Sequence, residues 1–264
     1  MADKTEEIDD LFVLTLGCPD RRGIVANVAQ FLTSNACNIV ESAQGGDPAD
    51  GKFFMRVCFR AEGKIRDADT FEKAFQGIAA EYGMASAFTR VGERPRVLIM
   101  VSRFGHCLND LLFRWRIGAL GMEIPAVVSN HRDYEKLVGS YDIPFIHLPV
   151  TKETKAEQEA KLLDLIDEQQ IDAVVLARYM QVLSPELCRR LPGRVINIHH
   201  SFLPSFKGAR PYHQAHSRGV KLIGATAHYV TEDLDEGPII EQDVERVDHA
   251  MSGDDFVSIG RDVE

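Results

Sequence analysis

The chain has 264 residues, enough for one or two domains that each bury a core of their own. Its formal net charge of −10 argues against a nucleic-acid partner, because nucleic-acid-binding proteins usually carry a basic face. Apolar residues make up 45% of the chain, as in ordinary globular proteins. No apolar run approaches the ~20 residues that a membrane helix needs, so we expect no membrane partner.

The cysteines and the N-terminus predict a cytoplasmic protein. Five cysteines without a C-x-x-C motif indicate free thiols rather than a disulfide framework. The opening residues Met1-Ala-Asp-Lys4 lead into no apolar segment, so we expect no signal peptide.

Residues 1–91 are predicted to form one domain with the order βαββαβ, which is ferredoxin-like. Its apolar positions follow the helical period after Gly23 and again over 67–82. Segments rich in β-branched and aromatic residues predict strands at 11–16, 38–42, 53–59 and 85–91. Residues 92–95, Gly-Glu-Arg-Pro, are predicted to be a linker.

The segment Cys18-Pro-Asp-Arg-Arg-Gly-Ile-Val25 resembles the start of the first helix in ACT domains, small modules that bind amino acids and often pair with one another. A glycine where a strand meets a helix leaves backbone N–H groups free for a ligand carboxylate. We expect a regulatory effector, glycine or methionine, at Asp20, Arg22, Gly23 and Ile24, in a homo-oligomer (dimer or tetramer). The structural alternative is that Gly23 permits the turn while Asp20 caps the helix.

Residues 96–264 are predicted to form a second, α/β domain with a Rossmann-like, mostly parallel sheet, because strand and helix patterns alternate. The apolar run from Val195 predicts a buried strand, on which Asn197 and His199 point to the same face. Loops at the carboxyl ends of such strands form the ligand sites of this architecture.

A second stretch, Glu232-Asp-Leu-Asp-Glu-Gly237, supplies acidic residues. An amide, an imidazole and a carboxylate are what acyl transfer needs: an oxyanion donor, a proton shuttle and a group that orients it. No Ser or Cys lies in a nucleophile-elbow context, so the attacking atom would come from a bound molecule. Spacing alone also fits a polar strand end without a catalytic role.

The segments Asn197-Ile-His199, Leu203-Pro-Ser-Phe-Lys-Gly208 and Asp233-Leu-Asp-Glu-Gly237 closely resemble motifs of the folate-dependent formyltransferase family. The resemblance implies 10-formyltetrahydrofolate as the substrate and Asn197, His199 and Asp235 as the catalytic residues. It also implies that the folate binds between two loops, at Leu176, Tyr179, Met180, Val182, Leu183, Val230, Glu232, Asp233 and Leu234.

The loop Ser102-Arg-Phe-Gly-His-Cys-Leu-Asn109 indicates which molecule accepts the formyl group. In the family's glycinamide-ribonucleotide enzyme this loop is Gly-rich and cradles a phosphate, whereas Phe104, His106 and Cys107 are bulky. We therefore expect water as the acceptor, in a hydrolase of a linear amide C–N bond that supplies formate for purine synthesis and balances the one-carbon pool. Arg103, His106 and His200 are predicted to hold product or water.

Two other functions compete with this one. The first is that of a phosphoribosylglycinamide formyltransferase. The second is an amino-acid-sensing regulatory protein whose folate domain no longer turns over.

No metal or cofactor is expected, since the folate is the substrate. His213-x-x-His216 has the spacing of a metal pair on a helix, but no third ligand stands at convincing spacing. Family members are expected to continue past Glu264 with an amphipathic helix and a short strand. We therefore expect the chain to stop where that helix begins and to lack both elements.

Overall fold

The computed structural model describes residues 10–205 and 210–264. Residues 1–4, considered above for a signal peptide, and Phe206, Lys207 and Gly208 of the motif Leu203–Gly208 lie outside them. The chain divides into two compact units, 1–93 and 94–264, at a boundary between residues of the predicted linker. Each unit has its own sheet and its own apolar core.

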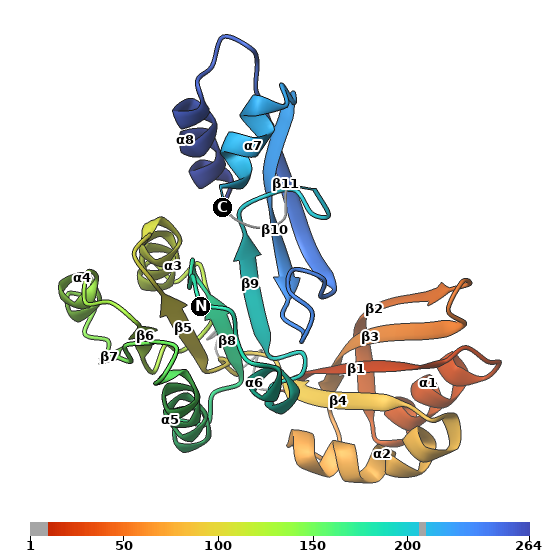
Figure 1. Ribbon diagram of the computed structural model, residues 1–264. Coiled ribbons are helices and arrows are strands. Elements are labelled where there is room, and N and C mark those ends of the chain that lie inside the picture. Colours follow the sequence, from red (N-terminus) through yellow and green to blue (C-terminus); the bar gives the residue numbers. More distant parts are fainter. Residues whose placement is uncertain (1–9, 206–209) are drawn as a thin grey trace, which may run out of the picture. The chain divides into compact units, whose positions relative to one another are not determined.

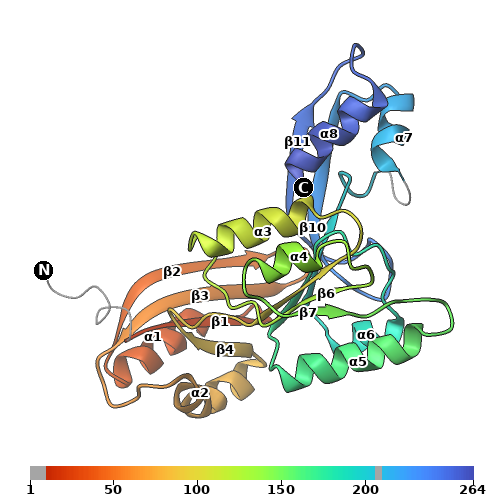
Figure 2. The same ribbon diagram turned by 90° about the vertical axis from the view of Figure 1, so that its left-hand side faces the viewer.

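The first unit follows the order βαββαβ. Its elements are β1 (Leu11–Pro19), α1 (Ile24–Ser34), β2 (Cys37–Asp47), β3 (Lys52–Ala61), α2 (Ala68–Tyr82) and β4 (Ala85–Arg90). The strands pair antiparallel in the order β2-β3-β1-β4. Both helices lie along one face of this sheet (Figures 1 and 2). This is the ferredoxin-like topology that the sequence predicts.

The core of the first unit lies between the sheet and its two helices. Alternate residues of β1 point inward, which buries Phe12 and Leu14, and Phe71 of α2 packs edge-on against Phe12 with 5.3 Å between ring centroids. The edge strand β2 is largely exposed. Ile39, Val40 and, on β3, Phe54 are exposed apolar side chains of this sheet.

The turn into α1 corrects the expectation that Asp20 caps this helix. The N-cap residue is Gly23, at φ 96°, and no side chain caps the helix. A Cβ at Gly23 would also lie 2.9 Å from the Tyr82 hydroxyl, so the position requires glycine. Ile24, predicted to contact the effector, has its side chain buried in the core, which leaves its backbone N–H as the group that could meet a ligand.

The second unit alternates strands and helices. In chain order it contains β5 (Val97–Val101), α3 (His106–Arg116), β6 (Val127–Ser129), α4 (Glu135–Gly139), β7 (Phe145–His147), α5 (Lys155–Glu168), β8 (Ala173–Leu176), α6 (Pro185–Arg190), β9 (Val195–His199), α7 (Pro211–Ser217), β10 (Leu222–Tyr229), β11 (Ile239–Arg246) and α8 (Gly253–Val263). The sheet order is β11-β10-β9-β8-β5-β6-β7. Strands β5 to β9 are parallel, and β10 and β11 are antiparallel, so the predicted mostly parallel sheet is confirmed.

The central strand β5 explains why the sheet is covered on both faces. All five of its residues are buried. Leu98 and Met100 belong to the core cluster shared with α5 and α6, while Ile99 and Val101 belong to the one shared with α3 and α4. Figure 2 shows these helix pairs on opposite sides of the sheet. In a parallel sheet that is covered on both faces, the loops at the carboxyl ends of the strands form the ligand site.

The C-terminal helix corrects a further expectation. The helix that was expected to begin only where the chain stops is already formed, since α8 spans Gly253–Val263 and opens with a capping box between Ser252 and Asp255. Phe256 packs with Tyr212 of α7 and Ile223 of β10 in a small core cluster. Within residues 10–205 and 210–264, no helix is both long and apolar enough to cross a membrane.

Candidate active site

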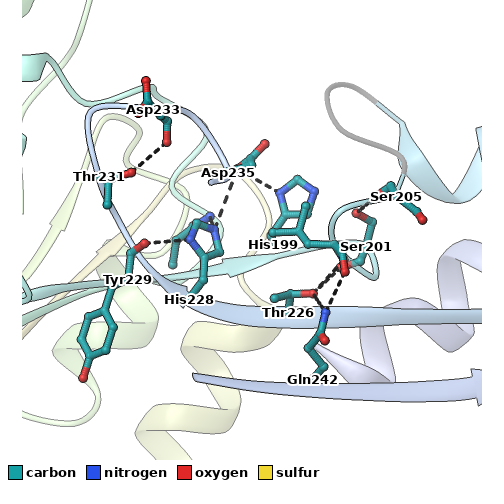
Figure 3. Close-up of polar contacts among 12 residues, drawn as sticks. His199, Ser201, Ser205, Thr226, His228, Tyr229, Thr231, Asp233, Asp235 and Gln242 are labelled. Carbon is teal, nitrogen blue, oxygen red and sulfur yellow. Dashed lines mark hydrogen bonds and ion pairs between the residues drawn. The ribbon is translucent and has the colours of Figure 1, made fainter. Parts of the chain in front are cut away.

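The ends of three strands bring the candidate catalytic residues together. Strands β8 and β9 are parallel neighbours, and Asn197 of β9 pairs with Leu176, the last residue of β8. Strand β10 returns antiparallel to β9, which places His228 opposite Asn197. The loop between β10 and β11 then carries Asp235 back toward His199 (Figure 3).

That loop is closed tightly at its base. The Tyr229 N–H donates to the Pro238 carbonyl at 2.9 Å, and a Cβ at Gly237 would collide with the Tyr229 carbonyl oxygen. Asp235 adopts the left-handed conformation at φ 58°, which Asp tolerates better than most residues. The glycine and the Asp at the end of the sequence motif thus have separate backbone roles.

His199 and Asp235 form a buried pair. The His199 Nδ1 and Asp235 Oδ1 atoms lie 3.2 Å apart, and the two side chains are 5% and 9% exposed. The hydrogen bond from His199 lowers the pKa of Asp235, so this carboxylate is ionised and can only accept. The Nδ1 atom of His199 therefore carries the proton. Its Nε2 atom is buried and has no hydrogen-bond partner among the described residues, which leaves a basic nitrogen for a bound molecule.

His228 links the pair to Asn197. Its Nδ1 lies 2.9 Å from the Tyr229 carbonyl oxygen, to which it can only donate. The Nε2 atom therefore accepts from the Asn197 side-chain amide at 3.2 Å, and it lies 3.9 Å from the Asp235 carboxylate. One N–H of Asn197 is used in this bond, and the other remains for a ligand. His228 is itself buried.

A second network fixes the chain just after His199 (Figure 3). The Thr226 hydroxyl donates to the Ser201 carbonyl at 2.8 Å and accepts from the Leu203 N–H at 3.1 Å. The Gln242 side chain donates to both the Thr226 hydroxyl and the Leu203 carbonyl, each at 3.0 Å. Strands β10 and β11 thereby hold the loop that follows His199.

All three candidate catalytic residues line one cavity of about 270 Å³. The nine residues predicted to contact the folate line the same cavity: Leu176, Tyr179, Met180, Val182, Leu183, Val230, Glu232, Asp233 and Leu234. Met180, Val182 and Leu234 are exposed apolar side chains in its wall. The Glu232 carboxylate is already paired with Arg189 at 2.7 Å. Sequence reasoning missed five further lining residues: Arg178, Gln181, Ile198, His228 and Thr231.

The loop after β8 is held from beneath by a buried serine. The Ser102 hydroxyl donates to the Asn130 side-chain oxygen at 2.7 Å and accepts from the Met180 N–H at 3.0 Å. The Ser102 N–H also donates to the Arg178 carbonyl at 3.2 Å. The loops after β5, β6 and β8 are thus joined through one side chain.

The predicted product or water site needs correction. His200 lines the cavity, but Arg103 and His106 do not. The Arg103 carbonyl accepts from Tyr134, and the His106 Nε2 atom lies 2.9 Å from the Glu264 carboxylate. Burial lowers the pKa of His200 to about 4, so its ring is neutral near pH 7.

Glu264 forms the centre of a buried polar cluster beside the cavity. Its carboxylate accepts from Tyr212 at 3.1 Å and pairs with Arg178 at 3.3 Å as well as with His106. Burial acts to raise the pKa of Glu264, but His106 and Arg178 outweigh this effect and lower it. No sequence motif points to Glu264. Arg178 could have been noticed as the one charged residue of the loop after β8, but the sequence analysis did not single it out.

Two groups were considered as metal sites, the His213-x-x-His216 pair and the cluster of His106, Cys107 and Glu264, and neither fits a metal ion. His216 of the His213-x-x-His216 pair is bonded to the Met251 carbonyl. His106, Cys107 and Glu264 offer ligand atoms within 4.8 Å of one another. Burial, aided by the charge of Glu264, raises the pKa of Cys107 to about 12, so this group lacks the thiolate that a metal needs. The Glu264 carboxylate is in addition already paired with Arg178.

The chain was compared with known proteins. Residues 95–264 match the formyl transferase family. The chain is 52% identical over 252 residues to the formyltetrahydrofolate deformylase of Corynebacterium sp. (strain P-1), which covers 96% of this chain and 88% of that protein. The formyltetrahydrofolate deformylase of Escherichia coli (strain K12) is 46% identical, with the same two coverages.

Solved structures give the same result. A formyltetrahydrofolate deformylase from Burkholderia mallei superposes with a TM-score of 0.91 at 53% identity and covers 97% of this chain and 90% of that one. A phosphoribosylglycinamide formyltransferase from Bacillus halodurans is 31% identical, covers 64% of this chain and 88% of that one, and has a TM-score of 0.59. The chain therefore belongs to the formyl transferase family, and relatives that match it over nearly its whole length are formyltetrahydrofolate deformylases.

The buried serine gives the first prediction. The substitution Ser102→Ala leaves the Met180 N–H and the Asn130 side-chain oxygen without this partner, so the free energy of unfolding should fall by about 1–3 kcal/mol in urea denaturation. The matched control Ser140→Ala removes an exposed hydroxyl on the same unit. Its effect should stay within about 0.5 kcal/mol. Equal stabilities of the two variants would contradict the role of Ser102.

The pH dependence of stability tests the state of Asp235. Since folding lowers its pKa, the stability that its carboxylate contributes is fully present above the unfolded pKa of about 3.9. It is lost as the pH falls through the lower, folded pKa. The difference in unfolding free energy between the native chain and Asp235→Asn should therefore shrink in that acid window. The exposed control Asp164→Asn on α5 should show a much flatter difference, and a flat difference for Asp235→Asn would refute the assignment.

Proposed function

We propose that this chain hydrolyses 10-formyltetrahydrofolate to tetrahydrofolate and formate. The chain shares 47–53% sequence identity with formyltetrahydrofolate deformylases over almost its whole length, which supports this activity. The observation that carries the proposal is the His199–Asp235 pair, whose basic Nε2 atom is buried beside the cavity formed by the two predicted folate loops.

The residue roles follow from the hydrogen bonds. Asp235 accepts from His199 Nδ1 and stabilises the charged imidazole, while Nε2 accepts a proton from the attacking water. His199 then returns that proton to N10 as the C–N bond breaks. The second N–H of Asn197 donates to the oxyanion of the tetrahedral intermediate. A formyl carbon carries no bulky substituent, so water reaches it readily.

The folate is proposed to bind along the loops after β8 and β10. The exposed apolar side chains of Met180, Val182 and Leu234 would cover the pterin ring, and backbone amides and carbonyls of the loops would meet its polar edge. Pairing with Arg189 makes Glu232 a rim residue, which leaves Asp233 as the freer carboxylate for the pterin amino group.

Water rather than an amine is the proposed acceptor. The loop after β5 has no open cradle for a phosphate, since Cys107 is buried and His106 is bonded to Glu264. Transfer to glycinamide ribonucleotide needs its phosphate to be anchored, because positioning of the amine supplies much of the rate of a two-substrate reaction. The reaction balances with water alone, so we propose no cofactor. The formate would supply purine synthesis, and the hydrolysis would balance the one-carbon pool. We propose that the reaction takes place in the cytoplasm.

For the first unit we propose an ACT-like regulatory role. The βαββαβ order and the Gly23 turn support it, since the turn presents the first N–H groups of the eleven-residue helix α1 beside the exposed Arg22. The proposed effector is glycine or methionine, whose carboxylate would bind there. The exposed apolar residues Ile39, Val40 and Phe54 support pairing of this sheet in a dimer or tetramer.

Turnover measurements test the catalytic proposal. Asp235→Asn should lower kcat by about 10²–10⁴, because the imidazole loses its orienting charge. Asn197→Ala should lower it by about 10²–10³ through loss of an oxyanion donor. Formate release from 10-formyltetrahydrofolate is the measurement, with Asp164→Asn as the control expected to keep full activity. No formylated product should arise with glycinamide ribonucleotide, and formylation at a rate rivalling hydrolysis would favour the transferase alternative. Absence of any turnover would favour the regulatory alternative.

A thermal-shift screen of the whole chain against the common amino acids tests the regulatory proposal. A ligand at one hundred times its Kd should stabilise the folded state by about 2.7 kcal/mol, which raises Tm. The response to glycine or methionine should weaken in Arg22→Ala, whereas Lys64→Ala, in a loop of the same unit, should keep it. No response to any amino acid, together with a monomeric elution volume, would leave this unit a purely structural role.

A further inference from the structure

Arg178 lines the cavity together with His199 and His200, yet the residue roles above leave it unused. Its side chain is only 10% exposed. The Nε and Nη1 atoms are buried, and neither makes a hydrogen bond within residues 10–205 and 210–264. Burying guanidinium N–H groups without hydrogen bonds is costly, so a folded protein keeps them for a reason.

The surroundings hold this guanidinium in place without satisfying it. Glu264 balances its charge at 3.3 Å, outside good hydrogen-bond geometry, and is itself fixed by His106 and Tyr212. The Phe104 ring lies 5.5 Å from the Arg178 guanidinium carbon. The backbone of Arg178 is left-handed at φ 62° and is held by the Ser102 N–H. Such strain persists only where the neighbouring structure imposes it.

The chemistry of hydrolysis supplies a ligand for these donors. Water adds to the formyl carbon, a C–O bond forms, the C–N bond breaks and N10 takes a proton. The remaining carboxyl proton is released, so the product is formate, with one negative charge. Transfer to an amine would instead give a neutral formamide. A guanidinium with free N–H groups matches the two oxygens of a carboxylate.

We propose that Arg178 binds the formate product in the active-site cavity, next to His199 and His200. This inference rests on the proposed function, and it makes Arg178 a residue that favours hydrolysis over transfer. It also corrects the predicted product site, in which Arg103 and His106 held the anion.

Glu264 limits the strength of this binding. Its negative charge lies beside the same guanidinium and repels a second carboxylate, while the neutral His200 adds no positive charge. Formate should therefore bind weakly. Weak binding lets the product leave after each turnover.

The first experiment measures binding without turnover. Carbon-13 formate is titrated into the whole chain, and line broadening of its NMR signal reports binding. The native chain should broaden the signal, Arg178→Gln should weaken the affinity at least tenfold and Arg178→Lys should weaken it less. Arg114→Gln, which removes an exposed guanidinium on α3, should leave it unchanged. Neutral formamide should not compete with formate. Equal affinity of the native chain and Arg178→Gln, or competition by formamide as strong as formate itself, would overturn the proposal.

Two further variants separate formate binding from a purely structural role of Arg178. Glu264→Gln should tighten formate binding, because it removes the competing charge. The double variant Arg178→Gln with Glu264→Gln leaves no buried charge unpaired, so it should fold yet fail to bind formate. Unchanged or weaker binding in Glu264→Gln would contradict the proposal, as would formate binding by the double variant.

Product inhibition connects the site to turnover. The inhibition constant of formate should rise at least tenfold in Arg178→Gln and less in Arg178→Lys, with a smaller change in KM for the folate. Hydrolysis with an unchanged inhibition constant would overturn this inference and leave the proposed function standing. Arg178-dependent formate binding in a chain that hydrolyses nothing would keep the anion site and refute the proposed function.

Discussion

The contact between His199 and Asp235 is the interaction on which the rest of the site depends. It joins the end of β9 to a loop that begins some thirty residues later, and it is buried, so its geometry must be held by other parts of the fold. The left-handed backbone of Asp235 and the tight closure at Gly237 aim the carboxylate at the imidazole. Because Asp235 fixes the proton on Nδ1, the buried Nε2 atom keeps its lone pair, and it has no hydrogen-bond partner among the described residues.

The sheet provides that rigidity through its change of strand direction. The parallel pairing of β8 and β9 puts their loops at one edge, and the antiparallel return of β10 brings His228 opposite Asn197. Buried hydroxyls then tie the loops to the strands: Thr226 binds the loop after His199, and Ser102 binds the loop after β8. A short, polar side chain at each place replaces backbone hydrogen bonds that irregular loops cannot make for themselves.

Two ion pairs lie beside one cavity, His199–Asp235 and Arg178–Glu264. In the first, the carboxylate of Asp235 stabilises a positive charge that forms on His199 during the proposed reaction. In the second, the carboxylate of Glu264 holds a permanent positive charge on Arg178. Hydrolysis of a formyl group moves a proton and creates an anion, and the two pairs match these two needs. The apolar wall of the cavity strengthens both effects, since low polarity weakens screening.

The sequence by itself determined the two-unit architecture and both sheet types, and it singled out His199 and Asp235, because period, turn residues and a long gapped motif are local signals. It also singled out nine residues of the loops after β8 and β10, which line one cavity. Only the tertiary structure revealed the contacts of His228, Arg178 and Glu264 and showed that His106 and Arg103 do not line the cavity. These side chains meet across large separations in sequence, and a hydrogen bond between distant elements leaves no periodic trace in either of them.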